Sequence, residues 1–289
     1  MRFSQTDLKI LEQLAQGTTD IKTIAKLLQK SDKQIYASSQ KLKTKNILDL
    51  FNGHLEPKKI PHITLLLRLL KNHPNLTTIL SGSGLAILGH LITPKKVTDI
   101  VQETGVSKSV VYDTIQQCLS ISVMTRRADN TYMINPEIWP DLQEFLHALI
   151  IYDETTDPRV PANSTIYNKN NKEILFSSNS SLDATRTGFS AYEQYGIKLL
   201  LPAIYYYLPK RNLSKKDVFI HSLYITEKEQ DIRHLTYISL FYVKYKNELI
   251  DVKHPLLDTI KQILLGKHIK GYPSLEEIRE KANVYDIRL

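Results

Sequence analysis

The stretch of sequence that decides the fold of the N-terminal half is VTDIVQETGVSKSVVYDTIQQCL, residues 97–119. Its apolar residues recur at helical spacing in two short runs, which are separated by Gly105 and Ser107. Glycine readily adopts the positive φ that ends a helix, and a serine before a helix can bond to backbone N–H groups that lack a helical partner. The stretch therefore predicts two helices joined by a tight turn.

The same pattern occurs 76 positions earlier in the chain. The matched pairs are Ile21 and Val97, Ile24 and Ile100, Ala25 and Val101, Ser31 and Ser107, Ile35 and Val111, and Tyr36 and Tyr112. The earlier copy has Gln29-Lys30 in place of the turn glycine, which leaves the geometry of its turn open.

Each copy is preceded by a further apolar-spaced segment, with leucines at positions 8, 11 and 14 or at 85, 88 and 91. Each is followed by two extended runs around a polar turn, Asn52-Gly53 in the first copy and residues 128–130 in the second. Three short amphipathic helices cannot bury their apolar faces alone, so we expect them to share one small core. The predicted order is three helices and then a two-stranded hairpin, twice over.

This order is that of a winged helix-turn-helix. Residues 97–119, with SGSGLAILGHLI before them and VMTRR and NTY after them, resemble bacterial and archaeal winged-helix transcription regulators over about residues 79–136. The apolar spacing, Gly105 and Ser107 agree with that family, whereas Val101 stands where the family usually has alanine. The resemblance implies that the third helix of each unit enters the major groove of DNA and that the wing flanks the backbone or the minor groove.

The DNA-binding candidates are the polar residues expected on the outer face of each third helix and on the second wing. In the first unit they are Ser31, Lys33, Gln34, Tyr36, Ser38, Lys41, Lys43 and Lys45. In the second they are Ser107, Lys108, Ser109, Tyr112, Asp113 and Gln116, with Arg126 and Arg127 on the wing. Lysines suit phosphates, and glutamine can pair with adenine. Two alternatives stay open: winged helices also dock proteins, and the two tyrosines can cover the edge of the core.

The net charge of +8 is concentrated near the N-terminus. Residues 1–60 hold eleven Lys or Arg against six Asp or Glu, whereas residues 151–289 hold twenty against seventeen. A positive field attracts polyanions, of which nucleic acid is the commonest. We expect the first unit to supply more of the phosphate attraction and the second more of the discrimination; a solvated lysine surface with no partner is the alternative.

Composition excludes several other classes of protein. With 289 residues, 42% hydrophobic and 24% charged, the chain is long enough for two or three packed domains and too apolar for wholesale disorder. No run approaches the roughly 18 apolar residues of a membrane span, and residues 1–5 lack the apolar core of a signal peptide. The lone Cys118 excludes an intramolecular disulfide framework and a cysteine-rich zinc site. We therefore expect a cytoplasmic protein without a membrane partner.

We expect an α+β chain in four parts: a first winged unit over residues 1–60, a helical linker over 61–76, a second winged unit with a C-terminal helix over 77–152, and an α/β domain over 164–289. The apolar linker is expected to pack between the units, with a dimer interface as the alternative. The last domain would serve dimerisation, sensing or partner binding. In it we expect a hairpin over 166–177, a helix over 184–196, strands over 218–226 and 236–245, and helices over 256–265 and 274–285, the last with a Ser274–Glu277 capping box.

A second resemblance concerns RTGFSAYEQYG, residues 186–196, which is similar to the "TG-S-A-…-G" segment of AbiEi-type antitoxins and their archaeal relatives. Residues 206–209, 217–221 and 271–277 are also similar to archaeal members. Those proteins combine an N-terminal winged helix with a nucleotidyltransferase-like domain. The resemblance implies a transcriptional autoregulator or an antitoxin-like repressor.

We expect that domain to be inactive and the chain not to be an enzyme. A working nucleotidyltransferase has Gly-Ser followed by paired carboxylates that hold magnesium, whereas Gly82-Ser83 has no acid before Asp99 and Ser190 leads only to Glu193. Asp217 and His221 are the best acid–base pair, and we expect His221, His234 and His254 to be structural. No cofactor or metal is expected.

The sequence thus predicts a sequence-specific regulator of transcription that binds double-stranded DNA, a repressor or an autoregulator. A homodimer and a cognate protein partner are left open. The alternatives are an antitoxin-like protein-binding module and a divergent nucleotidyltransferase.

Overall fold

The computed structural model describes residues 1–289 and divides into two compact units, Met1–Asp153 and Glu154–Leu289. Both units combine helices with small antiparallel sheets, so the α+β class expected from the sequence is confirmed. No helix is both long enough and apolar enough to cross a membrane.

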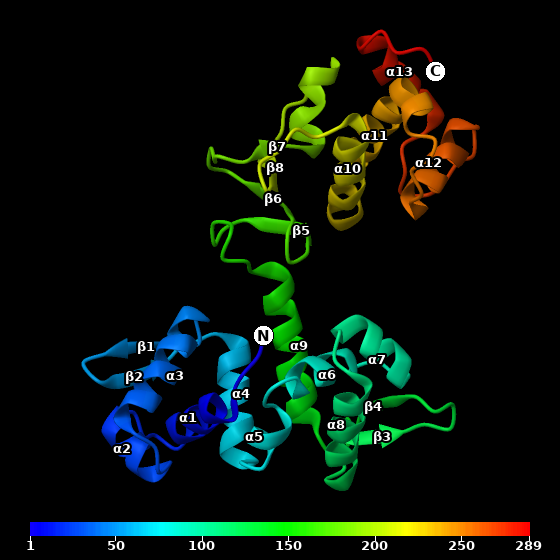
Figure 1. The fold of residues 1–289 in the computed structure, drawn as a ribbon. Helices are drawn as coiled ribbons and strands as arrows, with labels where there is room; N and C mark the ends of the chain where they lie inside the picture. Colours follow the sequence, from blue (N-terminus) through cyan, green and yellow to red (C-terminus); the bar gives the residue numbers. More distant parts are fainter. The chain divides into compact units, whose positions relative to one another are not determined.

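The first repeat of the N-terminal unit consists of three helices and a hairpin (Figure 1). The elements are α1 (Gln5–Ala15), α2 (Ile21–Leu27), α3 (Asp32–Thr44), β1 (Leu48–Phe51) and β2 (His54–Pro57). Asn52 and Gly53 both have positive φ, which a two-residue hairpin turn of the primed type requires. Asp20 adds an isolated bridge to His54, so the segment before α2 pairs with the hairpin.

The second repeat has the same elements in the same order: α6 (Gly84–His90), α7 (Val97–Thr104), α8 (Lys108–Ser120), β3 (Met124–Arg126) and β4 (Tyr132–Ile134). Its second helix, third helix and first strand each begin 76 positions after their counterparts. A bridge from Lys95 to Tyr132 matches the one between Asp20 and His54. The repeat in the sequence is therefore a repeat of structure.

The turn between the second and third helices has the same handedness in both repeats, although only one of them has glycine. Gly105 ends α7 with a φ of 65°, and Gln29, at the matching position, has a φ of 52°. The turn of the first repeat therefore has the same backbone conformation as that of the second, although it lacks glycine. Gln29 bears the cost of a left-handed conformation, about 1–2 kcal/mol for a residue with a Cβ.

A helix follows each hairpin, and these two helices join the repeats. They are α4 (Pro61–Asn72) and α9 (Pro140–Thr155), with the short α5 (Leu76–Ile79) after α4. The two helices run antiparallel, because residues from the start of α4 to just after its end contact residues from the end of α9 to just before its start. The pairs are His62 with Tyr152, Arg68 with Glu144, and His73 with Trp139. Since α4 also packs on α1 and one hydrophobic core spans both repeats, the linker lies between them, as we expected.

The C-terminal unit contains an antiparallel sheet of four strands in the order β5-β6-β8-β7. The strands are β5 (Thr165–Lys169), β6 (Ile174–Ser178), β7 (Thr185–Arg186) and β8 (Ile204–Leu208). The helices are η1 (Gly188–Tyr195), α10 (Lys215–Glu229), α11 (Ile232–Tyr245), η2 (Lys246–Glu248), α12 (Pro255–Leu264) and α13 (Leu275–Val284). The predicted first hairpin, the two last helices and the capping box of α13 are confirmed.

Three predicted elements of this unit are wrong. Residues 218–226 and 236–245, predicted as strands from their Val, Ile, Tyr and Phe content, form α10 and α11. A capping box of Ser214 and Asp217 starts α10, and its buried residues recur at helical rather than alternating spacing. Residues 184–196, predicted as one helix, form β7 and the 3-10 helix η1. Gly188 interrupts them with a φ of 52°, and a Cβ there would lie 2.5 Å from the Ile225 side chain.

Candidate nucleic-acid interface

The first candidate surface is the outer face of α3. Its inner face is fixed by Ile35, Ser39 and Leu42, which are buried in the core of the repeat. Apart from Ser38 and Gln40, which are half-buried, the remaining positions are exposed, among them Lys33, Lys41 and Lys43. Tyr36 is 50% exposed, so it projects to solvent instead of covering the core edge.

The N-terminus of α3 uses two of the predicted contact residues for its own structure. Ser31 Oγ accepts a hydrogen bond from the Gln34 backbone N–H at 3.3 Å, and Gln34 Oε1 accepts one from the Ser31 backbone N–H at 3.2 Å. This capping box satisfies donors that the helix leaves unpaired. It also orients Gln34 while its amide NH₂ stays unbonded and exposed.

The exposed lysines of α2, α3 and the turn between them have no carboxylate partners, whereas Lys58, after the hairpin, pairs with Asp49. Six exposed lysines form no ion pair: Lys22, Lys26, Lys30, Lys33, Lys41 and Lys43. Their positive field is therefore not neutralised locally and is available to a polyanion. Of these, Lys22, Lys26 and Lys30 were not among our candidates, although the lysine count of residues 21–45 was a sufficient signal.

Lys45 differs from the other candidate lysines. Its ammonium group donates a hydrogen bond to the Arg2 carbonyl and lies 5.4 Å from the centre of the Phe3 ring. The side chain is half-buried and ties the N-terminal segment to the end of α3. Ser38 is also half-buried.

The second candidate surface is the outer face of α8, where Lys108, Ser109, Asp113 and Gln116 are exposed. Ser107 occupies the N-cap position with extended backbone, but its side chain makes no capping bond, so the predicted cap is wrong. The residue three positions on is Val110, which has no polar group to complete a capping box. Tyr112 is 42% exposed, and the Lys108 ammonium lies 5.9 Å from the centre of its ring.

The hairpin of β3 and β4 carries the two predicted arginines. Arg126 donates a hydrogen bond to Asn130 Oδ1 at 2.6 Å, and its guanidinium lies 6.0 Å from the Tyr132 ring centre. Arg127 is exposed and forms no ion pair. The hairpin of β1 and β2 has no such cations; its Phe51 is exposed at the turn instead.

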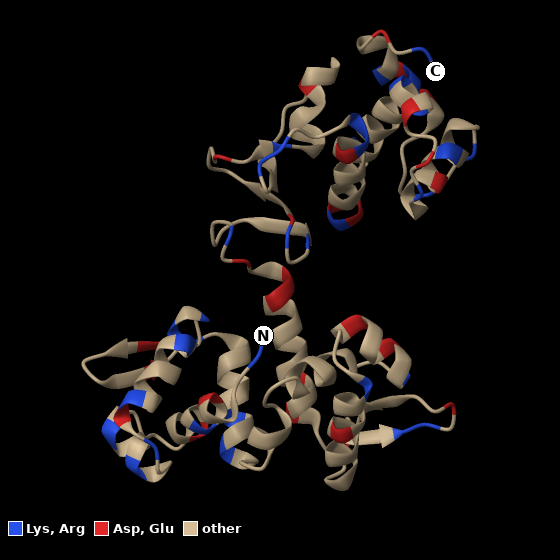
Figure 2. Ribbon diagram, viewed as in Figure 1, with Lys and Arg blue, Asp and Glu red and all other residues tan.

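The two surfaces differ in charge although their backbones match. Residues 21–45 contain seven lysines and one aspartate, whereas residues 97–121 contain one lysine and three acids. Figure 2 shows the basic residues on α2 and α3 and the acidic residues on α7 and α8. Glu103 is engaged by Lys95 at 2.5 Å and His90 at 2.9 Å, and the hydrogen bond from Lys95 lowers the pKa of its carboxyl.

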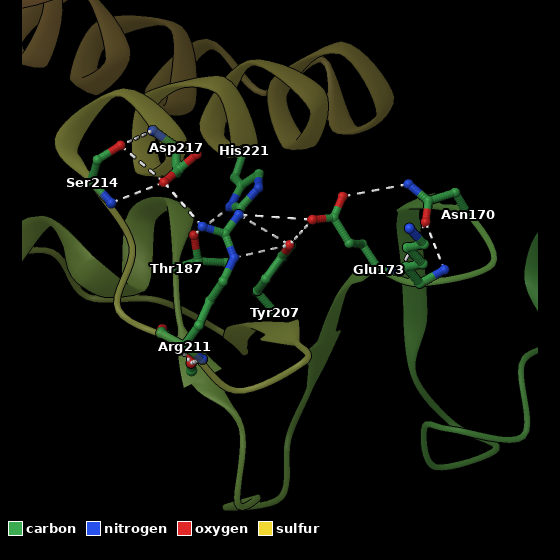
Figure 3. A network of polar contacts seen from close by, with 10 residues as sticks. Asn170, Glu173, Thr187, Tyr207, Arg211, Ser214, Asp217 and His221 are labelled. Carbon is green, nitrogen blue, oxygen red and sulfur yellow. Dashed lines mark hydrogen bonds and ion pairs between the residues drawn. The ribbon is translucent and has the colours of Figure 1, made fainter.

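A separate polar network lies in the C-terminal unit, where α10 meets the sheet (Figure 3). Arg211 Nη2 lies 3.2 Å from Tyr207 Oη, whose hydroxyl donates to Glu173, and Arg211 Nη1 lies 3.6 Å from Asp217. These groups line a pocket of about 230 Å³ together with His221. Strand pairing brings them together from distant parts of the sequence, and no local motif could have indicated it.

Asp217 and His221, the acid–base pair noted in the sequence, do not bind each other. Asp217 accepts hydrogen bonds from the backbone N–H and the hydroxyl of Ser214, each at 2.9 Å. Burial alone would raise the pKa of Asp217, but these bonds and the Arg211 charge outweigh it and lower the pKa. His221 Nδ1 lies 2.7 Å from the Thr187 hydroxyl, and desolvation lowers the pKa of this histidine to about 4. Thr187 is fully buried, so the His221–Thr187 pair presents no accessible nucleophile.

The segment that resembles AbiEi-type antitoxins packs against this network. Ser190 Oγ accepts a hydrogen bond from the Tyr205 backbone N–H at 2.8 Å, and Tyr192 is fully buried. Gly196 ends η1 with a φ of 73°. These residues connect η1 to β8 and to the helical core. No group of three or more His, Cys, Asp or Glu side chains could hold a metal ion.

Comparisons with protein-family models, with curated proteins and with solved structures give no match for this chain.

Proposed function

We propose that the chain is a transcription regulator that binds double-stranded DNA through tandem winged helix-turn-helix units, with the first unit as the principal DNA-binding module. The observation that carries the proposal is the outer face of α3 and α2, with six exposed lysines and no ion-paired carboxylate. The major groove is wide enough for an α-helix, and lysines without ion pairs on that helix suit the phosphates on either side of the groove.

The matched architecture of the two repeats supports the proposal. In each repeat a helix with a buried inner face and a polar outer face follows a tight left-handed turn and precedes a hairpin. Such an arrangement presents the helix at the surface with its orientation set by the core. In the proposed complex Lys33, Lys41 and Lys43 contact phosphates, while Gln34, Tyr36 and Gln116 are placed to meet base edges.

Salt-dependent binding of a duplex tests the proposal, with a random-pool selection to supply the preferred sequence. The affinity should fall steeply with salt, since each phosphate contact contributes about 0.9 to the slope of log K against log salt. Lys41→Ala should lower that slope by about 1, whereas Lys45→Ala, which removes an internal contact, should leave it nearly unchanged. A slope near zero for the unmodified protein would contradict DNA binding.

A protein-docking role for the second repeat is the alternative that a specific observation favours. Its segment 97–121 has an excess of acids, and α8 exposes Val110 and Tyr112. Acidic side chains repel phosphates, whereas exposed tyrosine beside an aliphatic residue is typical of protein interfaces. On this alternative the chain is antitoxin-like: the first repeat binds DNA and the second a cognate protein. Duplex affinity that is insensitive to every change on α8 would favour it.

A further inference from the structure

A surface groove in the C-terminal unit is separate from both candidate DNA-binding helices. It has a volume of about 550 Å³ and lies where α11, α12 and α13 converge. Its apolar lining comes from Tyr242 and Val243 on α11, Leu264 and Leu265 at the end of α12, Leu275 on α13, and Leu289. Leu265 is 88% exposed, which is unusual for a leucine beside other apolar side chains.

The remaining side chains around the groove are mostly cationic. Lys246, Lys261, Arg279 and Arg288 line it, and no acidic residue does. Only Lys261 has a carboxylate neighbour, Asp258, at 3.6 Å within the same helix. Since α12 and α13 also carry acids, the absence of acids from the lining reflects which helix faces meet there.

We propose that this groove binds an acidic, amphipathic segment of a partner protein. Apolar side chains of the segment would cover Leu264, Leu265 and Leu275, and its carboxylates would pair with the four cationic groups around them. The charge complementarity selects an acidic occupant, and the apolar lining selects one with an aliphatic or aromatic face.

Two other occupants fit less well. A second copy of this chain docked groove to groove would bring two sets of four cations together, and like charges at an interface oppose association. A nucleic acid duplex would satisfy the cations but would leave the leucines without apolar contact. The proposal is independent of DNA binding by the N-terminal unit.

A designed peptide tests the proposal on the full chain. The probe is a fluorescent helix of about 16 residues with leucines at positions i, i+3, i+4 and i+7 and glutamates at most other positions. It should bind, and raised salt should weaken the binding. A peptide with lysines in place of the glutamates, and one with serines in place of the leucines, should each bind about tenfold more weakly or not at all.

Variants of the chain locate the binding site. The pair Lys246→Glu and Arg279→Glu should weaken peptide binding about tenfold, and Leu265→Ser about fivefold. The control pair, Lys172→Glu and Lys253→Glu, changes the same number of exposed charges outside the groove and should have little effect. All the substituted side chains are exposed or at the surface of the unit, and circular dichroism verifies that each variant is folded.

Several outcomes would overturn the proposal. One is equal binding of the acidic and basic peptides, and another is peptide binding that the groove variants do not change. A third is an acidic peptide that does not bind while the same groove residues are required for binding phosphatidylserine vesicles, for binding duplex DNA, or for a dimer seen by sedimentation. In that case the groove belongs to a membrane, a nucleic acid or a second copy instead.

Discussion

Residues 21–45 and 97–121 occupy matching positions in the two repeats, yet the first segment carries seven lysines against one aspartate and the second one lysine against three acids. Their buried residues correspond, since Ile35 and Leu42 of α3 match Val111 and Cys118 of α8. The core therefore sets the position of each helix, and the outer face is free to differ. A shared fold does not imply a shared partner.

The largest difference should appear when charge is removed from one repeat at a time. Replacing Lys33, Lys41 and Lys43 by alanine should weaken duplex binding about 100-fold and lower the salt slope by about 3. The matched control removes three cations from the second repeat, Lys108, Arg126 and Arg127. Fluorescence anisotropy at several salt concentrations measures both triple variants. Equal losses would show that both repeats contact phosphates to the same extent.

Substitutions in the turn should change the stability of the two repeats in opposite directions, with a loss at Gly105 and a small gain at Gln29. Gly105→Ala places a Cβ at a φ of 65° with no atom within 4 Å of it, so only backbone strain is added, about 1 kcal/mol. Gln29→Gly removes such strain and should stabilise the first repeat by less than about 1 kcal/mol, because glycine also gains freedom in the unfolded chain.

The rate at which a thiol reagent labels Cys118 measures the effect of Gly105→Ala on the second repeat. Cys118 is buried in α8, and desolvation raises the pKa of its thiol to about 12, so a thiol reagent reaches it only when the second repeat opens. Gly105→Ala should speed labelling about fivefold and Gln29→Gly should leave it unchanged. Slower labelling of the Gln29→Gly variant would mean that the repeats open together, because that change stabilises the first repeat.

Reversing a charge on α8 should make the second repeat more like the first. Asp113 lies where the first repeat has Ala37, and its exposed carboxylate has no cationic partner. Asp113→Lys should strengthen duplex binding about threefold to fivefold and steepen the salt slope by up to 1. Glu276→Lys on α13 is the control for a general gain of positive charge. Unchanged affinity would favour a protein partner for α8.

The smallest expected effect concerns His62 on α4, the helix that lies between the repeats. His62 is buried against Tyr152, its Nε2 has no hydrogen-bond partner, and desolvation lowers its pKa. The unfolded chain therefore binds a proton more readily, so the contribution of His62 to stability is present above its unfolded pKa of about 6.5 and is lost as the pH falls below it. His62→Leu should flatten the stability of the N-terminal unit between pH 7.5 and 5.5, measured by urea unfolding. An unchanged slope would assign the pH dependence to other groups.

The repeat and its helices could be predicted because their signals are local. Apolar spacing, the serine cap at Ser31 and the Asn52-Gly53 turn each act within a few residues. The strands predicted over 218–226 and 236–245 failed because side-chain type is a weak guide when a segment is buried on most sides.

The sequence by itself determined where the two repeats begin, which face of each third helix is polar and how unequally the lysines are distributed. Only the tertiary structure decided which of those lysines are free: Lys41 and Lys43 project to solvent, whereas Lys45 bonds to the Arg2 carbonyl. It also brought the Glu173–Tyr207–Arg211 network and the cationic groove of the C-terminal unit together. Both depend on the packing of segments that are distant in the chain, and no periodicity within a helix or a strand encodes such contacts.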